Sequence, residues 1–241
     1  TSNSYEFTSW WADSNNKPIY NLMAFGKTFF AKHSLLNILT KNCVFTSDQM
    51  LLTMRPYQIV ATERVLQKIV MSENQKTLGT IDAGGYVWHT TGSGKTLTSF
   101  KTAQIASKMP SVDKVLFVVD RKDLDYQTMK EYNRFQEGAA NASNSTKQLQ
   151  ERLEDPSAKI IITTIQKLSK FISLNPNHSV HDKRVVLIFD ECHRSQFGDM
   201  HVAIKKAFSN YNLFGFTGTP IFAANSSSGN NPNLRTTEQA F

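Results

Sequence analysis

The stretch YVWHTTGSGKTLTSFKTAQIA, residues 86–106, contains a short apolar run, a glycine-rich turn and an amphipathic run, in that order. A strand, a glycine turn and a helix in this order are the setting of a P-loop. Glycines let successive backbone N–H groups point inward, and the next helix directs its positive end at bound phosphates. The stretch therefore predicts a nucleoside triphosphate site, with a cradle formed by Thr91, Gly92, Ser93, Gly94, Lys95 and Thr96.

Two side chains of this cradle have predicted roles. Lys95 would reach the β- and γ-phosphates, and the hydroxyl of Thr96 would ligate Mg²⁺. A chance glycine turn would carry both by accident, and a dinucleotide loop would need a glycine where Leu97 stands. His89 occupies the position of the first glycine of the strict pattern, but that glycine only relieves crowding at the strand end. The pattern therefore favours triphosphate binding over both alternatives.

From about residue 80 onwards, continuous apolar runs alternate with amphipathic runs. Apolar runs without polar alternation are typical of parallel strands that helices cover on both faces. We expect strands within residues 84–90, 114–120, 159–165, 184–191 and 211–219, and helices within 96–109, 121–135, 166–174 and 199–208. The predicted fold class is therefore α/β, a parallel sheet with helices on both faces.

The other segments do not follow this alternation. Residues 1–49 predict a mainly helical appendage, and residues 55–70 an amphipathic helix with Pro56 in its first turn. Residues 136–148 are rich in Ala, Asn and Ser, which predicts a surface loop before the next helix. Residues 223–241 are poor in apolar side chains and predict a mobile tail or linker.

Composition bounds the partners and the compartment. The formal charge of +7 favours a polyanionic partner without requiring one. No apolar run approaches the roughly 20 residues of a membrane-spanning helix, and no signal peptide is present, so we expect a cytoplasmic protein. Cys43 and Cys192 are too few for a disulfide framework or a zinc site, and we expect reduced thiols. The chain starts at Thr1 and ends in a polar stretch, as expected for a fragment.

Two acidic residues end the apolar run RVVLIFDE, residues 184–191. Asp190 and Glu191 would lie at the carboxyl end of a buried strand, the edge at which open α/β sheets bind ligands. One carboxylate there can hold Mg²⁺, and the other can orient and deprotonate an attacking water. A solvated acid pair is the alternative, but the P-loop upstream favours catalysis. Cys192 beside them is expected to be a small apolar filler.

The motifs TTGSGKT, DECH and TGTP, in this order, resemble motifs I, II and III of superfamily 2 helicases and translocases. YVWHTTGSGKTLTS, VVDRKDLDYQ, TTIQKL, FDECHRSQFG and FGFTGTPIF resemble the first RecA-like motor domain of the R (motor) subunit of type I restriction endonucleases. The resemblance covers residues 50–225, and residues 1–49 resemble, less specifically, the connection from nuclease to motor. It implies a P-loop NTPase fold that uses ATP and Mg²⁺.

The resemblance also implies roles in the ATP site. Gln58, in RPYQ, would contact adenine, while Lys95 and Thr96 would hold phosphate and Mg²⁺. Asp190 would be the Mg²⁺-binding carboxylate, and Glu191 the general base.

Further roles implied by the resemblance concern coupling and DNA. His193 would couple hydrolysis to the TGTP motif, where Thr217 and Thr219 would relay the nucleotide state. The positions at which such motors grip the phosphates of one DNA strand, without reading its sequence, correspond to Arg121, Thr163 and Thr164.

Each of these assignments has a structural alternative. Gln58 could be a helix-surface residue, Arg121 a solvated charge and His193 a capped loop histidine. Thr163 and Thr164 could be β-branched strand residues and nothing more.

The expected function is ATP-driven translocation along double-stranded DNA, with methyltransferase and specificity subunits as partners, before cleavage by a nuclease domain outside these residues. We expect a connector over 1–49, a motor domain over 50–225 and a linker to a second RecA-like domain over 226–241. The alternatives are another superfamily 2 helicase acting on DNA or RNA, or a nucleotide-binding module without catalysis. Because a second motor domain supplies an arginine finger, we expect the chain alone to bind nucleotide weakly and hydrolyse little.

Overall fold

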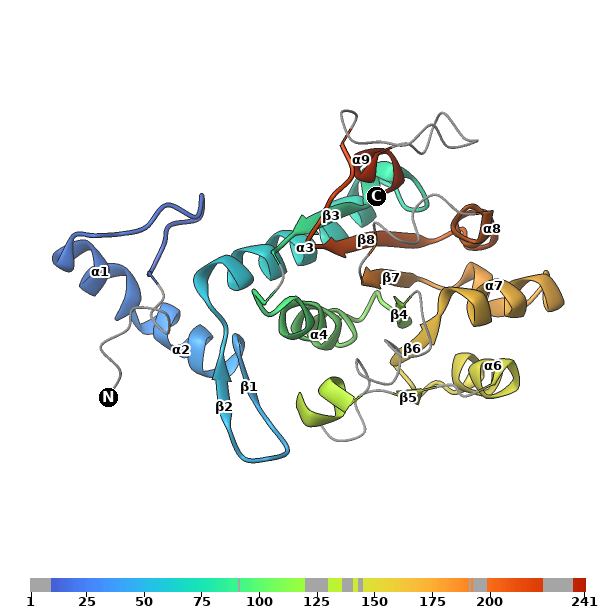
Figure 1. Ribbon diagram of the computed structural model, residues 1–241, viewed down its shortest axis with the longest axis horizontal. Coiled ribbons are helices and arrows are strands. Elements are labelled where there is room, and N and C mark those ends of the chain that lie inside the picture. Colours follow the sequence, from blue (N-terminus) through green and yellow to red (C-terminus); the bar gives the residue numbers. More distant parts are fainter. Residues whose placement is uncertain are drawn as a thin grey trace.

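A six-stranded parallel sheet forms the centre of the computed structural model, in the order β3-β8-β7-β4-β6-β5 (Figure 1). The structure describes residues 10–90, 92–119, 130–135, 141–142, 145–190, 192, 199–222 and 236–241. The strands are β3 (Gly85–Trp88), β4 (Lys114–Val119), β5 (Asn141–Ala142), β6 (Ile160–Thr164), β7 (Val185–Asp190) and β8 (Tyr211–Thr217). All neighbouring strands pair in parallel, which confirms the predicted sheet.

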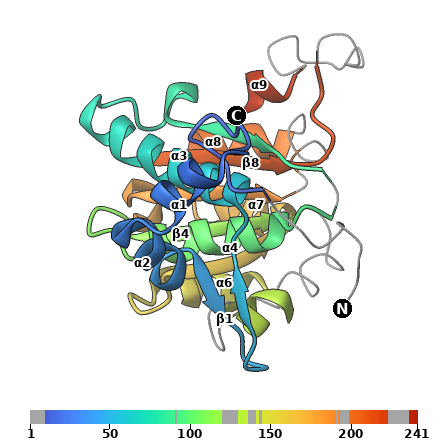
Figure 2. The same cartoon turned by 90° about the vertical axis from the view of Figure 1, so that its left-hand side faces the viewer.

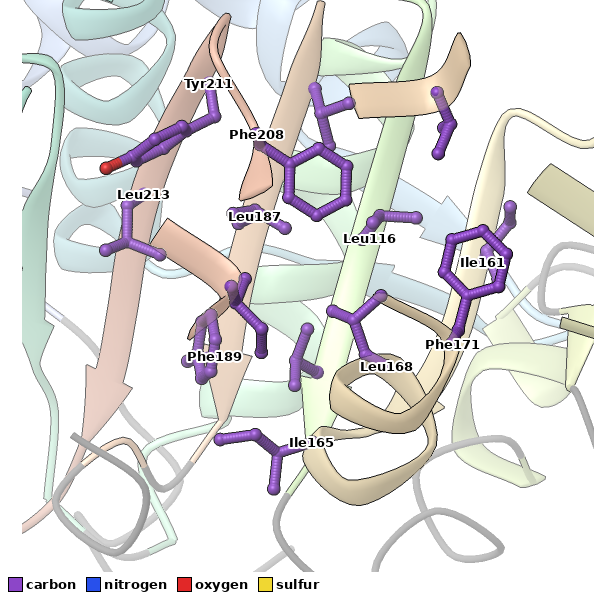
Figure 3. Packing of buried hydrophobic residues seen from close by; sticks show 14 of the residues in the cluster. Leu116, Ile161, Ile165, Leu168, Phe171, Leu187, Phe189, Phe208, Tyr211 and Leu213 are labelled. Carbon is purple, nitrogen blue, oxygen red and sulfur yellow. The ribbon is translucent and has the colours of Figure 1, made fainter. Parts of the chain in front are cut away.

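Successive residues of the buried strands point into two different hydrophobic clusters, one on each face of the sheet. On β4, Leu116 belongs to the first cluster and Phe117 to the second. The helices of the first face are α6 (Thr146–Glu154), α7 (Ile165–Leu174), α8 (Asp199–Ala207) and α9 (Thr237–Ala240). Figure 3 shows Leu168 and Phe171 of α7 packed over the strands there. The second face carries α3 (Pro56–Asn74), α4 (Lys95–Ala106) and the helical residues 130–135. Helices on both faces confirm the predicted fold class.

Helix α3 begins where the sequence predicts and runs four residues past the predicted end at residue 70. Pro56 takes the first helical position, and the backbone N–H of Arg55 donates to Gln58 Oε1 at 2.8 Å. Val65 and Ile69 face the sheet and are buried. Among the described residues, no helix combines the length and the apolarity that a membrane crossing requires.

The prediction of a loop over residues 136–148 is wrong at two points. β5 pairs with β6 as an additional edge strand, and α6 already begins at Thr146. Ser145 Oγ accepts a hydrogen bond from the Gln148 N–H at 3.2 Å, which caps the helix. The polar composition that suggested a loop therefore includes a helix cap, a role for which serine is preferred.

The tail predicted to be mobile instead contains helix α9 (Thr237–Ala240), and its last residues are packed in the core, while 223–235 lie outside the described residues. The ring of Phe241 lies 5.6 Å from that of Phe189 and 5.2 Å from that of His201. Space for it exists because position 215 is a glycine: a Cβ there would lie 3.0 Å from Phe241 Cγ and 2.7 Å from Cys192 Sγ. This ring contact and the two hydrogen bonds between Thr237 and Ile221 hold the polar segment against the rest of the domain.

The N-terminal appendage consists of α1 (Leu22–Phe29), α2 (Lys32–Thr40) and an antiparallel hairpin of β1 (Cys43–Phe45) and β2 (Leu51–Thr53). Figure 2 shows it in front of α3 and α4. Lys101 of α4 donates from Nζ to the Cys43 carbonyl at 2.8 Å, and the Ser47 N–H donates to the Arg134 carbonyl at 2.7 Å. Both cysteines are free thiols, as predicted.

His201 gives the core a dependence on pH. It is fully buried between Phe189 and Phe241, and neither ring nitrogen has a hydrogen-bond partner in the described part of the chain. Burial lowers the pKa of His201 to about 3, and the charge of Lys205 contributes to the lowering. The folded state therefore holds the neutral ring, whereas the unfolded state takes up a proton near its ordinary pKa.

We predict that this difference destabilises the protein by about 2 kcal/mol between pH 7 and pH 5, because only the unfolded state binds the extra proton there. Chemical denaturation at both pH values measures it. His201→Phe should lose about this much less stability on acidification than the wild type. The control His33→Phe removes an exposed histidine and should leave the pH dependence unchanged. Equal acid sensitivity of His201→Phe and wild type would contradict the assignment.

Candidate functional site

Three sequence motifs meet at the carboxyl edge of the sheet. Val87 of β3 pairs with Phe216 of β8, and Phe216 pairs with Asp190 of β7. Neighbouring strands lie about 4.8 Å apart, so this row places Asp190 about 10 Å from the end of β3. The glycine-rich turn follows β3 directly, and the TGTP turn follows β8. Asp190 thus lies at the carboxyl end of its buried strand, as predicted, and the other two motifs share that edge of the sheet.

The glycine-rich turn has the backbone of a phosphate loop. Gly92 and Gly94 adopt φ values of +79° and +78°, the left-handed region that side chains disfavour. Helix α4 starts at Lys95, and the Thr98 N–H donates to the Gly94 carbonyl at 3.1 Å. Lys95 and Thr96 are half-buried in the first turn of that helix. The turn thus delivers backbone N–H groups and a helix N-terminus to one place, which suits a phosphate.

Gln58 contacts this loop. It is buried, and its Nε2 donates to the carbonyls of Ser93 and Gly94, both at 3.1 Å. Its Oε1 accepts the Arg55 N–H described above, so both amide N–H groups and one acceptor site are used. The alternative of a helix-surface glutamine is wrong, because the side chain joins α3 to the loop. The adenine contact stays a prediction.

His89 joins the loop to two neighbours. Its N–H donates to the Thr217 carbonyl at 3.0 Å. Its ring meets that of Tyr57 edge-on, with centroids 5.2 Å apart and planes at 87°. Tyr57 in turn donates from Oη to the Ser93 carbonyl at 2.8 Å. Burial lowers the pKa of His89, and the positive charge of Lys95 lowers it further, so the neutral ring is favoured.

Sequence reasoning missed Tyr57. It stands next to Gln58 in RPYQ, but the contact joins residues 57 and 93, and no local pattern relates positions so far apart. A tyrosine at the start of a helix is also expected to serve as an ordinary apolar anchor.

The TGTP turn is built around Thr217. This side chain is buried, and its hydroxyl accepts the Thr219 N–H at 3.1 Å, whereas Thr219 itself is exposed. Because the Thr217 carbonyl also accepts from His89, the turn and the phosphate loop are connected through one residue.

Of the acid pair, the structure describes only Asp190. Asp190 ends β7 and is half-buried, while Glu191 and His193 lie outside the described residues, as does Thr91 of the loop. Burial raises the pKa of Tyr132, with a further contribution from the negative charge of Asp190. Cys192 is fully buried against Gly215, which confirms its expected role as a filler.

Thr163 and Thr164, expected at a DNA strand, are both buried on β6. Thr164 Oγ1 accepts the Lys167 N–H at 3.3 Å and so caps α7. Their side chains therefore have structural roles in this conformation, and contact with phosphates stays a prediction. Arg121 lies outside the described residues.

A groove of about 900 Å³ opens beside the phosphate loop, between α3 and the edge strand β3. Tyr57, His89 and Ser93 line its end next to the loop. Arg64 and Lys68 line it farther along α3, and the described lining residues include no carboxylate. The groove has the volume and the positive charge to take a nucleotide beside the loop.

The residues present fit a magnesium–nucleotide complex. Thr96 offers a hydroxyl at the start of α4, and Asp190 a carboxylate across the edge. Within the described residues, no group of three or more His, Cys, Asp or Glu side chains could hold a metal alone. A cation here would therefore depend on phosphate oxygens and water as well, which is the usual situation of Mg²⁺ at phosphates.

Comparison with known proteins agrees with this geometry. The model of the family described as SWI2/SNF2 ATPase matches residues 57–241, and the chain therefore belongs to the SWI2/SNF2 ATPases. The Sulfolobus solfataricus SWI2/SNF2 ATPase core, solved in complex with double-stranded DNA, aligns with a TM-score of 0.52 at 19% identity, over 76% of this chain and 34% of that one. At this identity the likeness shows a shared fold.

Within that class, the chain is a member of the type I restriction enzyme endonuclease subunits. It is 45% identical to one from Staphylococcus aureus over 221 residues, 90% of this chain and 23% of the relative. It is 50% identical to the C-terminal part of such a subunit from Mycoplasma pneumoniae, over 82% of this chain and 99% of the relative. The resemblance inferred from the motifs is confirmed. The chain spans about a quarter of the Staphylococcus aureus relative.

The loop glycines should differ in their tolerance of a side chain. Gly92→Ala meets no atom within 4 Å and pays only for the left-handed backbone, about 1 kcal/mol. At Gly94 a Cβ would lie 2.6 Å from Gln58 Nε2, so Gly94→Ala also displaces Gln58 and should cost about 2–3 kcal/mol. Chemical denaturation measures both, with Gly26→Ala in α1 as a control without either penalty. Equal costs at positions 92 and 94 would count against the Gln58 contact.

Proposed function

We propose that this chain is the ATP-binding and ATP-hydrolysing motor domain of a type I restriction endonuclease R subunit, which drives translocation along double-stranded DNA before cleavage by a nuclease domain of the longer subunit. The observation that supports it best is the row Val87, Phe216 and Asp190. This row brings a phosphate loop, an acid and the TGTP turn to one sheet edge in a SWI2/SNF2 ATPase.

ATP is bound in this proposal at the start of α4. The N–H groups of the loop and Lys95 hold the β- and γ-phosphates, and Thr96 and Asp190 hold Mg²⁺, which neutralises phosphate charge. The base occupies the groove near Tyr57. Gln58 Oε1 keeps a second acceptor site for the amino group of adenine, whereas donation to adenine would require giving up a hydrogen bond to the loop carbonyls, since both N–H groups are in use.

We assign hydrolysis to the residues that follow β7 in the sequence. Glu191 orients the attacking water and accepts its proton, and His193 links this event to the TGTP turn. Thr217 and Thr219 pass the change on. The supporting contact is the hydrogen bond from His89 to the Thr217 carbonyl, since movement of the phosphate loop would shift the turn with it.

The positive charge of the chain supports contacts with DNA. The chain carries a net charge of +7, and a motor that moves along DNA must hold phosphates without reading bases. We assign such contacts to Arg121 and to the segment around Thr163 and Thr164. The double-stranded DNA in the complex of the related Sulfolobus ATPase core is consistent with duplex as the track.

The longer subunit would supply the rest of the machine. Residues 1–49 would connect the motor domain, 50–225, to the nuclease, and 226–241 would lead to a second RecA-like domain, with α9 packed on the first. Methyltransferase and specificity subunits would complete a cytoplasmic complex. The chain covers 23% of the Staphylococcus aureus relative, which leaves most of that protein's length for such further parts.

Removal of the proposed general base, Glu191, tests the assignment of catalysis. In the complete subunit, Glu191→Gln should lower the rate of ATP hydrolysis about 10²–10⁴-fold, because water loses its proton acceptor. ATP binding should persist, since the phosphate loop is unchanged. The control Glu151→Gln removes an exposed carboxylate of α6 and should hydrolyse at the wild-type rate. Unchanged turnover of Glu191→Gln would refute the assignment of the base.

The 241 residues alone should bind ATP weakly and hydrolyse little, because the transition state lacks the arginine of a second motor domain. An ATPase assay with and without duplex DNA measures this. Robust DNA-stimulated turnover would show that the chain is sufficient by itself.

Triplex displacement by the complete complex distinguishes translocation along duplex DNA from strand separation. Unwinding without displacement would favour a helicase.

A further inference from the structure

The Ser93 carbonyl of the phosphate loop accepts two hydrogen bonds from the first turn of α3. Tyr57 Oη donates at 2.8 Å and Gln58 Nε2 at 3.1 Å. Gln58 Nε2 also donates to the next carbonyl, that of Gly94, at 3.1 Å. Two successive carbonyls of the loop are therefore turned toward α3.

The direction of a carbonyl fixes the direction of the N–H that follows it. In a trans peptide the C=O and the next N–H point to opposite sides of the chain. With the Ser93 carbonyl directed to Tyr57, the N–H of Gly94 points away from α3, and the Gly94 carbonyl orients the N–H of Lys95 in the same way. These N–H groups are the donors that a phosphate cradle needs, so α3 orients them before any ligand arrives.

His89 holds Tyr57 in place for this contact. Its ring meets the tyrosine ring edge-on at 5.2 Å, a favourable geometry for two aromatic rings. Arg55 Nη1 approaches Tyr57 Oη at 3.5 Å on the exposed side, which leaves the hydroxyl proton for Ser93. A glycine at position 89, as in the strict P-loop pattern, would remove the ring and leave Tyr57 without this support.

We propose that Tyr57 and His89 form a pair that positions the phosphate loop for polyphosphate binding, with Tyr57 as the positioning residue and His89 as its support. In this loop a ring contact and a tyrosine hydrogen bond take the place of the first glycine of the strict pattern. This inference rests on the proposed function as an ATP site, because it concerns the phosphates of that ligand.

Titration calorimetry of the chain with Mg²⁺-ATP and with Mg²⁺-tripolyphosphate, which has no base, tests the pair. Tyr57→Phe keeps the ring and removes the hydroxyl, so it should weaken both ligands by the same factor, about three- to tenfold, the effect of one hydrogen bond. The control Tyr20→Phe removes the hydroxyl of a tyrosine that is 75% exposed and should change neither affinity. Weakening of ATP alone would show that Tyr57 contacts the base and would overturn the proposal.

Position 89 gives the sharper test. His89→Gly restores the strict pattern, yet it should weaken both ligands about threefold or more, whereas His89→Phe keeps a ring and should bind as the wild type does. Combined with Tyr57→Phe, His89→Gly should add little, because both act on one hydrogen bond. Thermal unfolding of each variant confirms that it is folded.

Three results would overturn the inference. His89→Gly could bind both ligands at least as well as the wild type, His89→Phe could be as weak as His89→Gly, or Tyr57→Phe could change neither affinity. In each of these cases the ATP site itself would stand. If the wild type bound neither ATP nor tripolyphosphate at millimolar concentration, the proposed function would fall as well.

Discussion

The backbone hydrogen bond from the His89 N–H to the Thr217 carbonyl decides where the phosphate loop leaves the sheet. At 3.0 Å it extends the pairing of β3 with β8 one residue beyond Trp88. The loop and the TGTP turn therefore start at the same level of the sheet. Because β8 is paired with β7 from Tyr211 to Phe216, the same register sets the position of Asp190. The spacing of the three motifs at the edge follows from strand pairing that the loops do not control.

The parts of the fold that the sequence predicts are those with a strong local signal. Runs such as VLFVV and VVLIF have only one good environment, a strand covered on both faces, and they form β4 and β7. The phosphate loop is equally recognisable, since its glycines occupy left-handed backbone that other residues avoid. Both signals lie within a few residues of the structure that they predict.

The remaining parts depend on contacts between distant residues. The two residues of β5 have no apolar pattern and form a strand only because β6 offers an open edge. Phe241 is held by the space above Gly215, which no local composition reveals. Thr163 and Thr164 end β6 and are buried, and Thr164 caps the helix that follows, which the strand pattern alone does not reveal. The contact of Tyr57 with Ser93 belongs to the same class, since it spans 36 positions.

Helix α4 carries the phosphate loop at one end, and seven of its residues, from Thr98 to Ala106, are buried. It packs against α3 and the sheet, and Lys101 ties it to the Cys43 carbonyl of the appendage. We expect a helix enclosed in this way to move only as a rigid body, because close-packed interiors deform little. A movement of the first turn of α4 would therefore also displace the hairpin of β1 and β2. If the proposed ATP site drives movement of α4, that movement would reach the appendage as well as the carboxyl edge of the sheet.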